Sequence, residues 1–134
     1  MRGVHGLLLS FPVALFTGAV FTDIAYLRSA EIQWTNFSAW LIAGAMVFCG
    51  VAAVWALIRL IVGFRGAARL RLIVEFGVLA LLFVLGLINS FKHSQDGWSS
   101  VGAFGLTLSI LCAVLALVAG FVAFSATDQR EIAR

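Results

Sequence analysis

Apolar residues run along the chain in four long blocks, separated by short segments that hold most of the charged residues. The blocks cover about residues 7–26, 37–58, 72–91 and 101–124. Each is close to the ~20 residues that a helix needs to cross ~30 Å of hydrocarbon. They lack the two-residue alternation of barrel strands, so helices are the backbone form that satisfies its own hydrogen bonds in lipid. The pattern predicts an all-α transmembrane four-helix bundle, with residues 1–134 as one domain.

The composition agrees with a chain surrounded by lipid. Of its 134 residues, 63% are hydrophobic and 11% are charged, whereas a soluble domain has about 25% charged residues. The formal net charge of +3 does not indicate nucleic-acid binding, because the basic residues lie at the ends of apolar blocks and do not interleave with aromatic ones. We expect the first block to remain as a span rather than to be cleaved as a signal peptide, since three more spans follow it.

The positive residues predict the orientation. Four spans place the N-terminus, the second loop and the C-terminus on one side of the membrane. That side holds Arg2, Arg59, Arg65, Arg69, Arg71, Arg130 and Arg134, and the other side holds Arg28 and Lys92. Because Lys and Arg gather in cytoplasmic loops, we expect both termini of this multi-pass membrane protein in the cytoplasm.

Small residues recur at four-residue spacing in three of the blocks, where they would let neighbouring helices approach closely. They are Ser10, Ala14 and Gly18 in the first block, Ala45, Cys49 and Ala53 in the second, and Cys112, Ala116 and Gly120 in the fourth. We expect all of them to pack against other helices. A disulfide requires an oxidising compartment, so two cysteines in the middle of apolar blocks are expected to act as small packing residues.

Ionisable residues inside a membrane are costly and therefore mark candidate sites. On the expected cytoplasmic side, His5 and Glu75 would meet if their helices are neighbours, as a proton-sensitive or metal-holding pair. The interpretation we favour is that Glu75 pairs with Arg71, one turn earlier, and reaches the headgroups. On the other side, Asp23 and Asn89 lie at similar depth. We expect a hydrogen bond between them that fixes helix packing, with a small polar site open to the periplasm as the alternative.

The sequence indicates neither a cofactor nor a catalytic centre. A bis-histidine haem needs two imidazoles at matching depth on facing helices, whereas His5 and His93 are predicted on opposite sides of the membrane. The chain has no phosphate-binding glycine loop and no clustered Cys/His spacing for a metal. We therefore expect no haem, no metal and no enzymatic activity.

Several short motifs resemble those of a known bacterial membrane family. They are His5, Phe11-Pro12 and Asp23 in the first block, Ala39-Trp40 and Gly44 in the second, Asn89 in the third, and Asp96-Gly97-Trp98 before the fourth. With these motifs nearly the whole chain is similar to the family catalogued as domain of unknown function 2231. The resemblance implies an inner-membrane protein of this topology and no particular activity. Glu75 stands where the family often has a histidine, so no histidine-based site carries over to that position.

Three functions are consistent with these features. The leading hypothesis is a non-enzymatic accessory or anchoring subunit of a larger membrane assembly, or a homo-oligomer, because the chain is small, carries small-residue strips and has no catalytic constellation. The first alternative is a small proton-coupled transporter or channel that uses Asp23 and Glu75. A haem-binding redox subunit is the disfavoured third.

Overall fold

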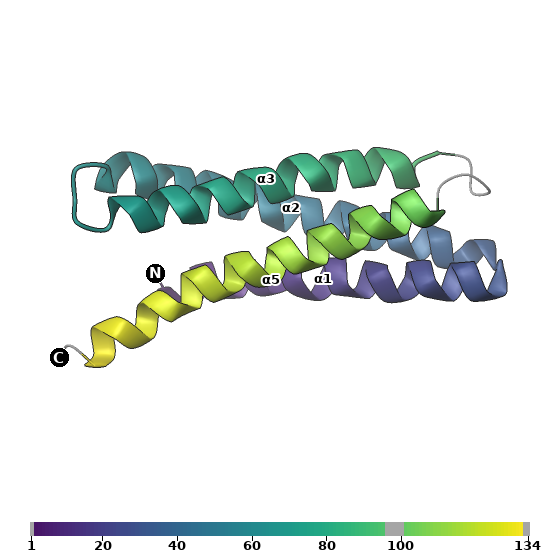
Figure 1. Cartoon of the computed structure of the whole chain (residues 1–134), viewed down its shortest axis with the longest axis horizontal. Coiled ribbons are helices and arrows are strands. Elements are labelled where there is room, and N and C mark those ends of the chain that lie inside the picture. Colours follow the sequence, from purple (N-terminus) through teal and green to yellow (C-terminus); the bar gives the residue numbers. More distant parts are fainter. Residues whose placement is uncertain (1, 96–100, 133–134) are drawn as a thin grey trace.

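The computed structural model describes residues 2–95 and 101–132 of the chain, and within them it contains four long helices (Figure 1). They are α1 (Arg2–Ser29), α2 (Ile32–Gly63), α3 (Arg69–His93) and α5 (Ala103–Ile132). The first three apolar blocks predicted from the sequence lie within α1, α2 and α3, respectively, and the fourth begins at residue 101, just before α5. The helices extend past most block ends because polar residues at the membrane surface can continue the same backbone hydrogen bonding.

All four helices are long and apolar enough to span a membrane. Their outward faces carry large apolar side chains, among them Phe21, Trp40, Val62, Leu70 and Phe121. Such surfaces are unfavourable in water and suited to lipid. The prediction of an all-α bundle of four membrane-spanning helices is confirmed.

The order of the helices around the bundle places α1 and α3 on one diagonal. α1 packs against α2 and α5, and α3 packs against the same two helices. Successive helices run in opposite directions, so α1 and α3 are parallel to each other. Figure 1 shows the N-terminus, the turn between α2 and α3 and the C-terminal end of α5 at the same end of the bundle. We call this the terminal end and the opposite one the distal end.

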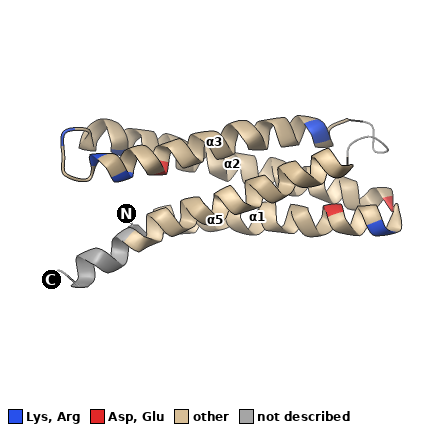
Figure 2. Ribbon diagram, viewed as in Figure 1, with Lys and Arg blue, Asp and Glu red and all other residues tan. Residues whose placement is uncertain are grey.

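Charged residues gather at the two ends of the bundle and leave its middle apolar (Figure 2). Arg65 and Arg69 are exposed at the terminal end, while Arg28 and Lys92 lie in the last turns of α1 and α3 at the distal end. Arg134 and the side chains of Arg2 and Arg130 lie outside the described part. The placement of the terminal end in the cytoplasm stays a prediction.

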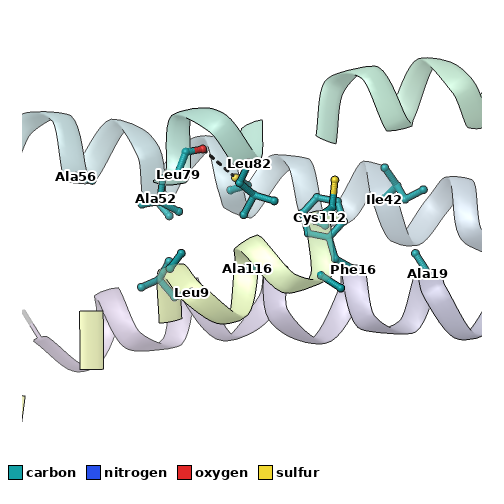
Figure 3. Close-up of a cluster of buried hydrophobic side chains, with 14 residues drawn as sticks. Leu9, Phe16, Ala19, Ile42, Ala52, Ala56, Leu79, Leu82, Cys112 and Ala116 are labelled. Atoms are coloured by element: carbon teal, nitrogen blue, oxygen red, sulfur yellow. Dashed lines mark hydrogen bonds between the residues drawn. The ribbon is translucent and has the colours of Figure 1, made fainter. Parts of the chain in front are cut away.

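The core is filled by a few large side chains and many alanines. Leu9, Phe16, Leu79 and Leu82 lie between the helices (Figure 3). The alanines come mainly from α2 and α5 and are Ala45, Ala52, Ala56, Ala113, Ala116 and Ala119. Small side chains bring helix backbones close enough to gain dispersion contacts, which drive helix association in lipid.

The small residues predicted to pack between helices fall into two groups. Ala45, Cys49, Cys112 and Ala116 are fully or almost fully buried, and both cysteines are free thiols. The thiol of Cys49 donates to the backbone oxygen of Leu79 at 3.9 Å. The structure places Ala53 against the edge of this core, Gly18 beside Leu41 and Gly120 beside Val13.

Ser10 and Ala14 form the second group, and the prediction that they pack against another helix of the chain is wrong. Both are exposed on the outward face of α1. The inward face of α1 is instead defined by Leu9, Phe16 and Asp23, which recur at helical spacing and are almost completely buried.

Gly86 marks the closest approach of α3 to its neighbours. A Cβ atom at this position would meet the Sδ of Met46 on α2 and lie 3.1 Å from Cζ of Phe16 on α1. The absence of a side chain therefore lets α3 settle between both helices. Gly77, nearer the terminal end of the same helix, has nothing within 4 Å of such an atom and faces outward.

Candidate functional site

Two groups of polar side chains, all buried except the partly exposed Arg59, lie at opposite ends of the apolar core. The terminal layer consists of His5, Arg59 and Glu75, and the distal layer consists of Asp23, Asn89, His93 and Ser109. The helical rise from His5 to Asp23 along α1 puts the layers about 27 Å apart. Each layer thus lies close to one edge of the hydrocarbon, where water and headgroups begin.

In the terminal layer, the carboxylate of Glu75 joins three helices. Its Oε1 accepts hydrogen bonds from Nη1 of Arg59 on α2 at 2.7 Å and from Nε2 of His5 on α1 at 2.8 Å. Glu75 is 1% exposed, and the guanidinium supplies the positive charge that a buried carboxylate needs. The indole of Trp55 covers His5, with 6.5 Å between ring centroids and 22° between planes.

The terminal layer leaves two buried polar atoms without a hydrogen-bond partner, Oε2 of Glu75 and Nδ1 of His5. The described residues contain no group of three or more His, Cys, Asp or Glu side chains able to hold a metal ion. The geometry around Glu75 is therefore that of an ion pair with an imidazole donor.

In the distal layer, a second imidazole–carboxylate pair joins the same two diagonal helices. Nε2 of His93 on α3 lies 3.0 Å from Oδ1 of Asp23 on α1, and both side chains are completely buried. Nδ1 of His93 lies 3.0 Å from the backbone oxygen of Asn89. The Asn89 side chain donates to Oγ of Ser109 at 3.2 Å, which extends the layer to α5.

Hydrogen-bond geometry sets the number of protons in the distal pair. A backbone carbonyl only accepts, so Nδ1 of His93 carries a hydrogen. Nε2 then either donates to an ionised Asp23 or accepts from a protonated one. In both arrangements one proton lies between the two side chains and the pair is neutral overall, which reduces the cost of burying it in lipid.

The comparison with known families agrees with the motifs in the sequence. A family model described as a predicted membrane protein (DUF2231) matches residues 2–129. The chain belongs to this family. No curated protein and no solved structure matches the chain. The family description gives this DUF2231 protein a membrane location and no activity.

The expected partner of Glu75 was wrong. The carboxylate of the DUF2231 protein does not turn along α3 towards Arg71 and the headgroups, because it is buried and hydrogen-bonded to His5 and Arg59 from other helices. Arg71 adds positive charge near the carboxylate. The meeting of His5 with Glu75, which was the alternative, is what the structure shows. Arg59 was missed because its position at the end of an apolar block explains it equally well as an orientation signal.

The expected hydrogen bond between Asp23 and Asn89 was also wrong. Asp23 bonds His93, and Asn89 reaches Ser109 instead. The equal spacing of two residue pairs could have revealed this, since His93 follows Glu75 by the same number of residues as Asp23 follows His5. On two parallel helices that meet at one of these pairs, the other pair must meet as well.

The alternative for Asp23 of the DUF2231 protein was a small polar site open to the distal side. Asp23 itself has no exposure. His93, however, lines a surface pocket of about 510 Å³ together with Gln33, Asn36 and Gln95. The side chain of His93 has no exposure either, so neither member of the pair opens onto this pocket. The Asp96-Gly97-Trp98 motif of the family lies outside the described residues.

The two histidines do not fit a bis-histidine haem within one chain. His5 and His93 lie in different layers, about 27 Å apart along the bundle. The Nε2 atom of each is also within hydrogen-bond distance of a carboxylate, Glu75 for His5 and Asp23 for His93. A haem iron would need both imidazoles on one axis.

Proposed function

We propose that this DUF2231 protein is a non-enzymatic accessory subunit of the bacterial inner membrane, which packs against another membrane helix through the outward face of α1. The partner helix belongs to a larger assembly or to a second copy. The observation that carries the proposal is the exposure of Ser10 and Ala14. Leu7, 61% exposed, and Phe21, 68% exposed, precede and follow these two small residues on the same side of α1, and we call the stretch between them the α1 notch.

The physical reason lies in how helices associate in lipid. Lipid tails solvate large apolar side chains well, so a lipid-facing surface gains nothing from a strip of small residues. A second helix does gain, because it can approach the backbone closely and fill the notch. The two imidazole–carboxylate pairs support the same role, since they tie α1 to α3 at both ends of the bundle and so hold the α1 face in a fixed position.

Bulky side chains in the notch are expected to dissociate the assembly. The double variant Ser10→Ile/Ala14→Ile would shift the protein, extracted from its native membrane in mild detergent, from a larger species to the monomer. Size-exclusion chromatography with light scattering measures the change. Ala43→Ile is the matched control, because Ala43 is exposed on α2, away from the notch. A wild-type protein that is already monomeric after gentle extraction would rule the proposal out.

Proton-coupled transport is the second candidate, and the neutral one-proton pair of Asp23 and His93 favours it. The pair lies beside a distal pocket, and Glu75 with His5 occupies the other end of the bundle. If the carboxylates carry protons across the membrane, Asp23→Asn or Glu75→Gln in liposomes would reduce proton flux to the level of protein-free vesicles. A pH-sensitive dye inside the vesicles reads the flux. Wild-type flux no faster than that of empty vesicles would exclude transport.

A further inference from the structure

We propose that the outward face of α2, together with the arginines after it, binds an anionic phospholipid, with one acyl chain along the helix and the phosphate at Arg65 and Arg69. The site is separate from the α1 notch and from the distal layer, and it adjoins the terminal layer at Trp55. It is formed by a groove, by the length of that groove and by the charges at its end.

The groove lies on the surface of α2 that faces lipid. It has a volume of about 490 Å³ and an apolar lining that includes Met46, Gly50, Val54, Trp55 and Ile58. Gly50 lies between Met46 one turn before it and Val54 one turn after it, and the ring of Phe83 on α3 closes the groove beside it, 3.3 Å from where a Cβ of Gly50 would be. The indole of Trp55 forms a wall, held from behind by its stacking on His5.

The length of the groove favours an acyl chain over a crossing helix. From Met46 to Ile58 the helical rise is about 18 Å, which is close to the ~15 Å of one hydrocarbon leaflet and well short of a whole bilayer. The end of the groove at Ile58 is the end nearer to Arg65 and Arg69 along the chain. Its apolar lining residues therefore extend over about the depth of the leaflet whose headgroups lie at the terminal end.

The charges at the terminal end fit a phosphate. The outward stripe of α2 continues past Ile58 through Val62 to Arg65, just beyond the last helical residue. Arg65 and Arg69 are exposed, and the guanidinium of Arg69 lies 4.2 Å from the ring centroid of Phe64. The aromatic ring fixes that guanidinium at the membrane surface, where two arginines can share one phosphate.

The nearby carboxylate of Glu75 does not compete with a phosphate for Arg65 and Arg69. It is the carboxylate among the described side chains at the terminal end, and it is buried and already hydrogen-bonded to Arg59. Among the described side chains there, the exposed charges are those of Arg65 and Arg69. An anionic headgroup is therefore attracted by both arginines, whereas a zwitterionic one brings its own positive charge into the same place.

Lipid binding to the purified full chain in mild detergent tests the proposal. Phosphatidylglycerol and phosphatidylcholine with identical acyl chains are titrated, and retention is measured by native mass spectrometry. Phosphatidylglycerol is expected to bind at least several-fold more tightly. Arg65→Gln/Arg69→Gln should weaken its binding by about tenfold or more, because each arginine near a charged headgroup contributes appreciably. Arg28→Gln, which removes an exposed arginine at the distal end, should leave it unchanged.

A second variant tests the groove without touching charge or core. Val54→Phe places a ring into the hollow from an outward-facing position, 58% exposed in the wild type, and should weaken phosphatidylglycerol binding several-fold while the fold is kept. Equal affinity for both lipids, or full binding by the double arginine variant, would overturn the proposal. So would displacement of the lipid by inorganic phosphate alone, which would make the site one for free phosphate. A protein helix found in the groove in place of lipid would overturn it too.

Discussion

Replacing Glu75 by alanine is expected to lower the free energy of unfolding by about 3 kcal/mol, the smaller end of the range for breaking a buried ion pair. The substitution removes the acceptor shared by Arg59 and His5. His5 then keeps a buried donor with no partner. The loss is at the smaller end because the side chain of Arg59 is 33% exposed and can turn towards the headgroups.

The measurement is equilibrium unfolding in detergent micelles by titration with a denaturing detergent. Glu75→Gln separates charge from hydrogen bonding, because the amide oxygen still accepts from Arg59 or His5, and a smaller loss is expected. Glu31→Ala serves as the control, since Glu31 is an exposed carboxylate before α2, and exposed substitutions usually change stability by less than about 0.5 kcal/mol. If Glu75→Ala changes the free energy of unfolding no more than Glu31→Ala does, the terminal layer does not hold the bundle together.

Breaking the interaction between Asp23 and His93 is expected to lower the free energy of unfolding by as much as Glu75→Ala does, or by more. Asp23→Leu and His93→Leu each leave one completely buried polar partner behind, which costs about 3–5 kcal/mol. The double variant Asp23→Leu/His93→Leu leaves neither, and replacing a buried pair by apolar residues is often neutral. The double variant should therefore be more stable than either single variant, a strongly non-additive result.

An exchange variant sharpens this test. Asp23→His/His93→Asp places the imidazole on α1 and the acid on α3, which is the arrangement already present in the terminal layer. It should recover most of the stability lost in Asp23→His alone. Two results together would show that the side chains do not interact in the folded protein. The stability losses of Asp23→Leu and His93→Leu would add up in their double variant, and Asp23→His/His93→Asp would be no more stable than Asp23→His.

Much of the fold could be predicted from the sequence because lipid imposes a simple rule on the backbone. A helix must cover the hydrocarbon with about 20 apolar residues, so four apolar blocks predict four spans. The short motifs around His5, Phe11-Pro12 and Asp23 indicated the family that the whole-chain comparison then showed. Neither result depends on how each helix is rotated about its own axis.

The candidate site depends on that rotation, and here the sequence was less informative. A strip of small residues on α1 is equally compatible with facing inward or outward, and Ser10 and Ala14 face outward. Arg71 is the neighbour of Glu75 along the helix, but Arg59 reaches it across the bundle. Partners that come from other helices cannot be read from spacing along one helix.

The diagonal arrangement of the two pairs has a consequence for how the protein is made. α1 is synthesised first and brings His5 and Asp23, whose partners Glu75 and His93 arrive only with α3. Until then the newly inserted α1–α2 hairpin holds a carboxylate in the bilayer with no imidazole beside it, a situation that lipid strongly disfavours. Both side chains of α1 therefore obtain their partners from the same later helix, and a chain cut short before α3 keeps Asp23 in the bilayer without His93.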